Sequence, residues 1–135
     1  MKKNFIKNKK NFFYLNKTSL LNFKKKIKNK NSGYKILLHG NSNKKLHQML
    51  IFHNSNVVIK PHLNKYPKSY YLIEGVFELI FYKNKKIFKK FLVNRKSPYI
   101  YFENKIFHTL NIKSEKVFLI ETTLGPHTKT IYSKW

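Results

Sequence analysis

Apolar and polar residues alternate along most of the chain after Tyr34, in short runs of the kind that form β-strands. The runs are rich in Ile, Val, Phe, Tyr and Leu, and Asn, Lys or Gly residues separate them. Lys83-Asn84-Lys85 and Glu74-Gly75 have the composition of tight turns, in which glycine can take a positive φ. The pattern predicts strands near 34–39, 46–53, 57–63, 69–73, 76–83, 86–93, 98–102, 106–112 and 116–123.

About eight short strands with no helix among them favour a closed or sandwiched antiparallel fold. A jelly roll removes most exposed strand edges, which suits a chain so rich in β-branched and aromatic residues. The sequence therefore predicts an all-β jelly-roll barrel over residues 34–135, with no internal repeat.

The first third of the chain has a different pattern. Residues 1–17 are rich in Lys and Asn, which predicts a flexible basic arm. From Thr18 the spacing of Leu and Phe is helical, with Thr18 or Ser19 as the cap and Asn31-Ser32-Gly33 as the end. Residues 18–33 are predicted to form one short helix near 18–30. Aromatic side chains in the arm could dock on the barrel or on a second subunit: Phe12, Phe13 and Tyr14.

Composition narrows the class of protein. A chain of 135 residues suits one domain with a substantial core. It has no Cys, which excludes disulfides and Cys-ligated zinc. No apolar run approaches the length of a membrane span, and the N-terminal residues are too polar for a signal peptide. We expect a cytoplasmic protein with no membrane partner.

The formal net charge is +24, from 29 Lys and Arg against five Asp and Glu. Clustered lysines can neutralise phosphates, so RNA binding through this surface is one interpretation. Coding bias is the other, because Lys, Asn, Ile, Phe and Tyr dominate and only one Arg, Arg95, is present. Nucleic-acid binders commonly use Arg for bidentate contacts. We therefore expect incidental rather than specific nucleic-acid binding.

The candidate chemistry lies in residues 56–75, with His62-x-Asn64, Lys68 and Gly75, and at His108 further along. The spacing resembles that of the cupin motifs, which have His-x-His, then Glu, then Gly, with a distant second His. The resemblance implies a double-stranded β-helix barrel with a mononuclear metal site. Imidazole and carboxylate ligands suit iron, manganese or zinc.

Strand alternation supports one shared cavity. In 57–64 it places Val58, Lys60, His62 and Asn64 on one face. In 106–110, Ile106, His108 and Leu110 share a face. Two strands of a barrel can therefore direct His62, Asn64 and His108 into one cavity. No Asp or Glu lies between His62 and Glu74, so no carboxylate stands near the Glu position of the cupin motif.

The chain is also similar to the WbuC family of cupin-fold proteins, found with genes for surface polysaccharides such as the lipopolysaccharide O-antigen. The similarity covers roughly residues 35–135, and the order and spacing of its segments carry it. The segments are Leu38-His39, Gln48-Met49, Pro61-His62, the stretch 69–75, Phe107-His108-Thr109-Leu110, Glu121, Gly125-Pro126 and Trp135.

The metal ligands carry over one by one as His62, Asn64, Lys68 and His108. An amide oxygen replaces one imidazole, and an ammonium group replaces the carboxylate. An ammonium close to a divalent ion repels it by several kcal/mol. We therefore expect a degenerate site with His62 and His108 as its remaining ligands, holding no metal or a weakly bound divalent ion.

The resemblance implies a protein that acts on or binds a nucleotide sugar or another polysaccharide precursor. A metal-free isomerase or epimerase would use His62 as general base, His108 as its partner or as the acid, and Lys68 to stabilise an enolate or grip a phosphate. A non-catalytic module that binds a sugar or an anion is the alternative. Both a monomer and a homodimer are compatible with the sequence. The other predicted pocket residues are Asn64, Lys60, Tyr70 and Glu121.

Several of these residues also have structural interpretations. His62 and His108 could be core residues that bond to each other or to Tyr, and Lys68 could point out of the barrel mouth into water. For Glu121 an ion pair with a neighbouring Lys is favoured over an acid–base role. The remaining histidines are predicted to be structural or on the surface: His39, His47, His53 and His127.

Overall fold

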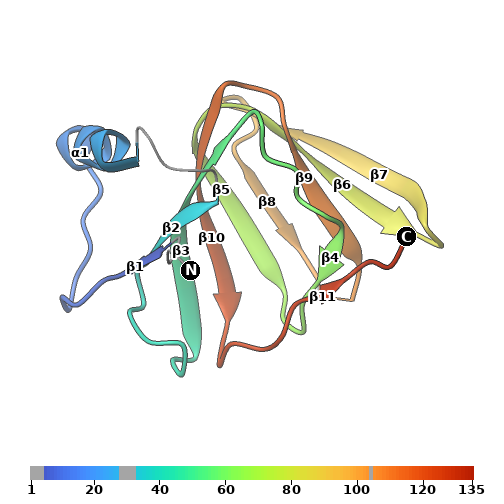
Figure 1. Cartoon of the computed structure of the whole chain (residues 1–135), viewed down its shortest axis with the longest axis horizontal. Coiled ribbons are helices and arrows are strands. Elements are labelled where there is room, and N and C mark those ends of the chain that lie inside the picture. The colour runs from blue at the N-terminus through green and yellow to red at the C-terminus, as the bar shows by residue number, and fades with distance from the viewer. Residues whose placement is uncertain (1–4, 28–32, 104) are drawn as a thin grey trace.

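The computed structural model describes residues 5–27, 33–103 and 105–135. One helix and two facing sheets make up these ranges (Figure 1). The helix is α1 (Lys17–Ile27), an element of 11 residues that is too short to cross a bilayer, and it is the one helix in the described ranges. The strands are β1 (Phe5–Lys7), β2 (Tyr34–Leu37), β3 (Leu46–Asn54), β4 (His62–Leu63), β5 (Lys68–Glu74), β6 (Phe77–Lys83), β7 (Lys86–Val93), β8 (Tyr99–Phe102), β9 (Phe107–Ile112), β10 (Lys116–Leu124) and β11 (Ile131–Tyr132).

The strand order is that of a jelly roll, as predicted. One sheet runs β1-β2-β3-β10-β5-β8 and the other runs β11-β4-β9-β6-β7. Two four-stranded sets, β3-β10-β5-β8 and β4-β9-β6-β7, face each other, and neighbours in each set are antiparallel. Strand β1 adds to the first sheet in parallel with β2, and β11 adds to the second beside β4.

Both predicted turns adopt the geometry that their sequences require. Asn84 and Lys85 have φ values of 51° and 65°, which joins β6 to β7 in a tight hairpin. Gly75 has a φ of 99° between β5 and β6, and a Cβ there would collide with the backbone of Lys116. These residues therefore set the register of the strands on either side.

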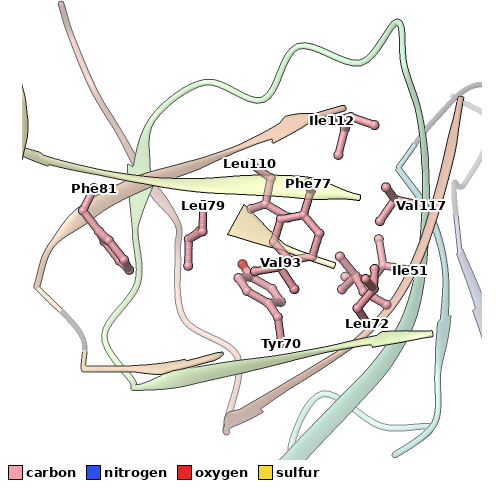
Figure 2. Close-up of a cluster of buried hydrophobic side chains, with 11 residues drawn as sticks. Ile51, Tyr70, Leu72, Phe77, Leu79, Phe81, Val93, Leu110, Ile112 and Val117 are labelled. Carbon is pink, nitrogen blue, oxygen red and sulfur yellow. The ribbon is translucent and has the colours of Figure 1, made fainter. Parts of the chain in front are cut away.

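The main core fills the space between the two sheets. In Figure 2, Phe77 and Leu79 point from β6 toward Tyr70 and Leu72 of β5. These side chains are at most 5% exposed. A second cluster lies on the outer face of the six-stranded sheet, where α1 packs Phe23 and Ile27 on it. The sheet contributes four buried side chains to this second cluster: Tyr34, Leu50, Phe52 and Phe118.

The cap of α1 differs from the prediction. Asn16 is the cap, because its side-chain oxygen accepts a bond of 2.8 Å from the Ser19 amide. Ser19 in turn accepts a bond of 2.8 Å from the Asn16 amide. This reciprocal pair closes the first turn, and α1 begins at Lys17, one residue before the predicted start at Thr18. The predicted helix end at Asn31-Ser32 lies outside the described residues.

The predicted strand 57–63 is also shorter than expected. Only His62 and Leu63 pair regularly, as β4. Pro61 has no amide hydrogen for a ladder bond, and the segment before it is irregular. Val57 and Ile59 pack inward on the core, while Val58 is 92% exposed. The alternation of faces predicted from Val58 onward is therefore wrong for Val58 and Lys60.

Candidate small-molecule cavity

A cavity of about 520 Å³ runs along the inner face of β3, where His47, Met49, Ile51 and His53 line it. Its wall comes from both sheets and from the segment that follows β10. Five predicted site residues line it: His62, Asn64, Lys68, Tyr70 and Glu121. A space of this size suits a ligand of several hundred daltons.

His62 and His108 lie directly opposite each other on β4 and β9, so their side chains share one face of the sheet. Their ring centroids are 4.5 Å apart. Nδ1 of His62 lies 3.0 Å from the Lys60 carbonyl, and Nδ1 of His108 lies 3.1 Å from the Ile106 carbonyl. A carbonyl can only accept, so each Nδ1 donates, and each neutral ring keeps its lone pair on Nε2.

Burial keeps both rings neutral. Desolvation lowers the pKa of His62, and the nearby Lys68 ammonium lowers it further. Desolvation also lowers the pKa of His108 to about 3, again with help from Lys68. His108 is only 2% exposed and packs on Phe102, with ring centroids 4.7 Å apart. His62 is therefore the member of the pair that lines the cavity, and His108 lies behind it.

Lys68 and Glu121 form a buried ion pair inside the barrel. The Lys68 Nζ is 3.3 Å from Oε1 of Glu121, and their side chains are 7% and 12% exposed. The two residues lie on adjacent strands, β5 and β10, which brings the charges together. This confirms the favoured ion pair of Glu121. Lys68 is not at the mouth in water, because Glu121 supplies a counterion in the interior.

Tyr70 lies next to the ion pair and directly across from Glu121 on the neighbouring strand. Desolvation, followed by the negative charge of Glu121, raises the pKa of Tyr70 well above its usual value. The phenol is therefore neutral. Asn64 also lines the cavity, and its amide donates a bond of 3.0 Å to Thr130. Lys60, predicted to be a pocket residue, is instead exposed and outside the lining because the chain is irregular before Pro61.

The donor set does not fit the metal that the cupin resemblance implies. His62 and His108 offer imidazole nitrogens, but the third and fourth positions hold an amide and an ion-paired ammonium. In the described ranges, no group of three or more His, Cys, Asp or Glu side chains has the geometry to hold a metal ion. Glu121 is the nearby carboxylate, and Lys68 already neutralises it.

Sequence reasoning missed part of the cavity wall. His39 and His47 stack with ring centroids 4.1 Å apart, and both line the cavity, as do His53 and His127. Cations at the β1–β2 side add positive charge: Lys7 and Lys35. Alternation along 46–53 could have found His47 and His53, since it places both on the inner face of β3.

The buried histidines predict a loss of stability in acid. Desolvation lowers the pKa of His53 from 6.5 to about 4. The unfolded chain then binds more protons than the folded chain between these values, so stability falls as pH decreases through this window. Each such histidine contributes a slope of up to about 1.4 kcal/mol per pH unit. Urea unfolding at several pH values should show this slope, and it should be smaller in His53→Gln. An unchanged slope in His53→Gln would show that His53 does not contribute.

Comparison with known family profiles and with curated proteins gave no match. Solved structures do match the fold. The DMSP lyase DddQ from Ruegeria pomeroyi has a TM-score of 0.56 at 9% identity, covering 67% of this chain and 44% of that one. A mutant of the oxalate decarboxylase OxdC from Bacillus subtilis has a TM-score of 0.55 at 15% identity, covering 66% and 24%. Vicilin from hazelnut, Corylus avellana, has a TM-score of 0.53 at 14% identity, covering 65% and 26%.

These comparisons define the class of protein as cupin-fold, which is the architecture predicted from the motif spacing. The chain spans less than half the length of each of these solved structures. At 9–15% identity the likeness shows the fold alone. The activities in their names belong to those proteins.

Proposed function

We propose that this chain is a cupin of the WbuC type that binds a nucleotide sugar or a related polysaccharide precursor and isomerises or epimerises it. Two features support an anionic sugar ligand. The cavity wall carries lysine side chains from three strands, and Glu121 is the only carboxylate among the described lining residues. The order of the WbuC-like segments along the chain supports the choice of substrate class.

The observation that carries the reaction is the bond between His62 Nδ1 and the Lys60 carbonyl. It leaves Nε2 unprotonated on a ring that lines the cavity. Because burial lowers its pKa, this nitrogen is available as a base near neutral pH. Nε2 of His108 is buried and has no partner among the described residues, and its ring supports that of His62 from behind.

The chemical step is removal of a proton from the sugar carbon next to a carbonyl. The proton passes to Nε2 of His62, and the electron pair moves onto the carbonyl oxygen as an enolate. The Lys68 ammonium stabilises that oxygen, with Glu121 as its fixed counterion. Return of a proton to the same or the neighbouring carbon completes an epimerisation or an isomerisation.

Deuterium exchange tests this proposal directly. In D₂O, the protein should introduce deuterium next to the carbonyl of an accepted keto sugar nucleotide. NMR of the sugar nucleotide measures this exchange over time. His62→Ala should slow this exchange by about 10²–10⁴-fold, the usual contribution of a general base. His127→Ala is the matched control, because it removes an exposed imidazole of the cavity wall that has no part in the proton transfer, and it should slow exchange far less than His62→Ala does. Equal exchange in His62→Ala and the parent would exclude His62 as the base.

A non-catalytic binding protein is the second candidate. The ion pair of Lys68 with Glu121 favours a binding protein, because a paired ammonium stabilises an enolate less than a free one does. Binding of the same sugar nucleotides without deuterium exchange would establish this alternative.

RNA binding through the basic surface is a minor alternative, and it should vanish near physiological salt if it is incidental. A cytoplasmic location stays a prediction.

A further inference from the structure

The edge strands of the two sheets border an open groove that is lined by aromatic side chains. Strands β7 and β8 are the last strands of their sheets, and Figure 1 shows β7 at the margin of the barrel opposite α1. The groove has a volume of about 870 Å³. Its buried side backs onto the cavity, because the ring centroid of Phe102 lies 5.2 Å from that of Phe81 and 4.7 Å from that of His108. Its rim carries five large side chains that are each 40–60% exposed: Phe88, Phe91, Leu92, Tyr99 and Tyr101.

The spacing of Tyr99 and Tyr101 suits two separate bases. These residues lie two positions apart on β8, so their side chains share a face of the sheet about 7 Å apart along the strand. They are 59% and 55% exposed, and the half-exposed Tyr71 lies directly across from Tyr99 on β5. Bases stacked on one another are only about 3.4 Å apart. A nucleic acid that places one base on each ring is therefore unstacked, which a single strand allows and a duplex does not.

The surroundings of the groove are strongly basic. Residues 83–102 contain seven Lys and Arg, among them the only Arg of the chain, and no Asp or Glu. All seven are exposed: Lys83, Lys85, Lys86, Lys89, Lys90, Arg95 and Lys96. Two of them reach aromatic rings of the groove, since the Lys83 Nζ lies 5.7 Å from the centre of the Phe88 ring and the Lys89 Nζ lies 5.4 Å from that of Phe91. Cations interleaved with aromatic rings suit a single-stranded nucleic acid, whose phosphates meet the cations while its bases stack on the rings.

Glu103 favours RNA over DNA as the occupant. It is the one carboxylate among the described residues that line the groove, and its Oε1 accepts a bond of 2.7 Å from the Tyr101 hydroxyl. A carboxylate can accept further hydrogen bonds, and the ribose 2′-hydroxyl is a donor that deoxyribose lacks. RNA therefore offers this carboxylate a partner, whereas DNA brings only phosphates that repel it.

We propose that the β7–β8 groove binds single-stranded RNA, with bases stacked on Tyr99 and Tyr101 and phosphates held by the lysines of the β6–β7 hairpin. Incidental attraction to a basic surface depends on charge density, which is higher in a duplex than in a single strand. A preference for the single strand therefore distinguishes binding in the groove from incidental binding.

Fluorescence anisotropy of the parent protein with a labelled oligouridylate of about 12 nucleotides tests this preference. At about 0.15 M NaCl, the single strand should bind at least about tenfold more tightly than an RNA duplex of the same length. It should also bind more tightly than the matching oligodeoxyuridylate. A duplex or a deoxy strand that binds as tightly would overturn the proposal, as would a single strand that does not bind at this salt concentration.

Aromatic substitutions test the groove itself. Tyr99→Thr with Tyr101→Thr keeps the strand propensity of β8 and should weaken binding at least about tenfold without changing its salt dependence. Tyr99→Phe with Tyr101→Phe keeps both rings and should bind like the parent. Phe12→Ser with Tyr14→Ser is the matched control, since both aromatics are 73% exposed on the basic arm, and it should also bind like the parent. Loss of binding in the arm variant, or a folded Thr variant that binds like the parent, would overturn the proposal.

Charge substitutions test the path of the phosphates. Lys83→Gln with Lys89→Gln should make the salt dependence shallower, by about 0.7 in the slope of log K against log[salt] for each cation that contacts a phosphate. Lys9→Gln with Lys10→Gln removes the same charge from the exposed arm and should leave the slope close to that of the parent. The reverse result would place the RNA on the arm and overturn the proposal.

Discussion

Asn64→His combined with Lys68→Glu should give a protein that binds Zn²⁺ or Mn²⁺ at least about 100-fold more tightly than the parent. The change supplies a third imidazole and a carboxylate beside His62 and His108, which already share one face of the sheet. It also removes the ammonium that repels a divalent ion by several kcal/mol. Calorimetric titration of untagged protein measures the affinity, and metal should also raise the unfolding temperature.

The control is Asn64→Gln with Lys68→Gln, which removes the positive charge without adding a metal ligand. It should gain far less affinity than the His and Glu pair. If the Asn64→His/Lys68→Glu protein folds but binds metal no better than this control, the four positions do not converge on one point. That outcome would contradict the alignment of the chain with the cupin motif.

Lys68→Met should lower the free energy of unfolding by about 3–5 kcal/mol, the usual cost of leaving one member of a buried ion pair without its partner. The carboxylate of Glu121 is nine-tenths buried and would be left without its counterion. Urea unfolding at neutral pH measures the change. Lys90→Met is the matched control, because the Lys90 Nζ is 3.8 Å from Glu78 but half exposed, and it should cost less than about 1 kcal/mol.

The double substitution Lys68→Met with Glu121→Leu separates the contribution of the ion pair to stability from the contribution of the packing around it. Replacement of a buried ion pair by apolar side chains of similar volume is often neutral or stabilising. The double variant should therefore recover most of the stability lost in Lys68→Met. A double variant as unstable as Lys68→Met would show that packing around Lys68, rather than the unpaired carboxylate, sets the cost.

Much of the fold was predictable because its determinants are local. The apolar alternation in 86–93 and 106–112 predicts strands within a residue of those observed. Gly75 and the Asn84-Lys85 turn fix where neighbouring strands reverse, through positive φ values that few other residues adopt. The motif spacing places His62 and His108 on strands that prove to be neighbours.

Short extended segments were less predictable, because their pairing depends on distant parts of the chain. Phe5–Lys7 and Ile131–Tyr132 are strands only where β2 and β4 offer open edges. Pro61 interrupts the ladder and turns Lys60 outward, although alternation alone placed it beside His62.

The jelly-roll strands and their tight turns follow from the sequence alone, since periodicity and glycine conformation act within a few residues. The facing of His62 and His108 across β4 and β9 and the electrostatics of the cavity depend instead on the tertiary structure. Lys68 and Glu121 are 53 positions apart, and the pairing of β5 with β10 brings their charges within 3.3 Å. A charged side chain is stable in the interior only beside its counterion, and that neighbour is set by strand order. The same dependence places His39, His47, His53 and His127 along the wall of one cavity.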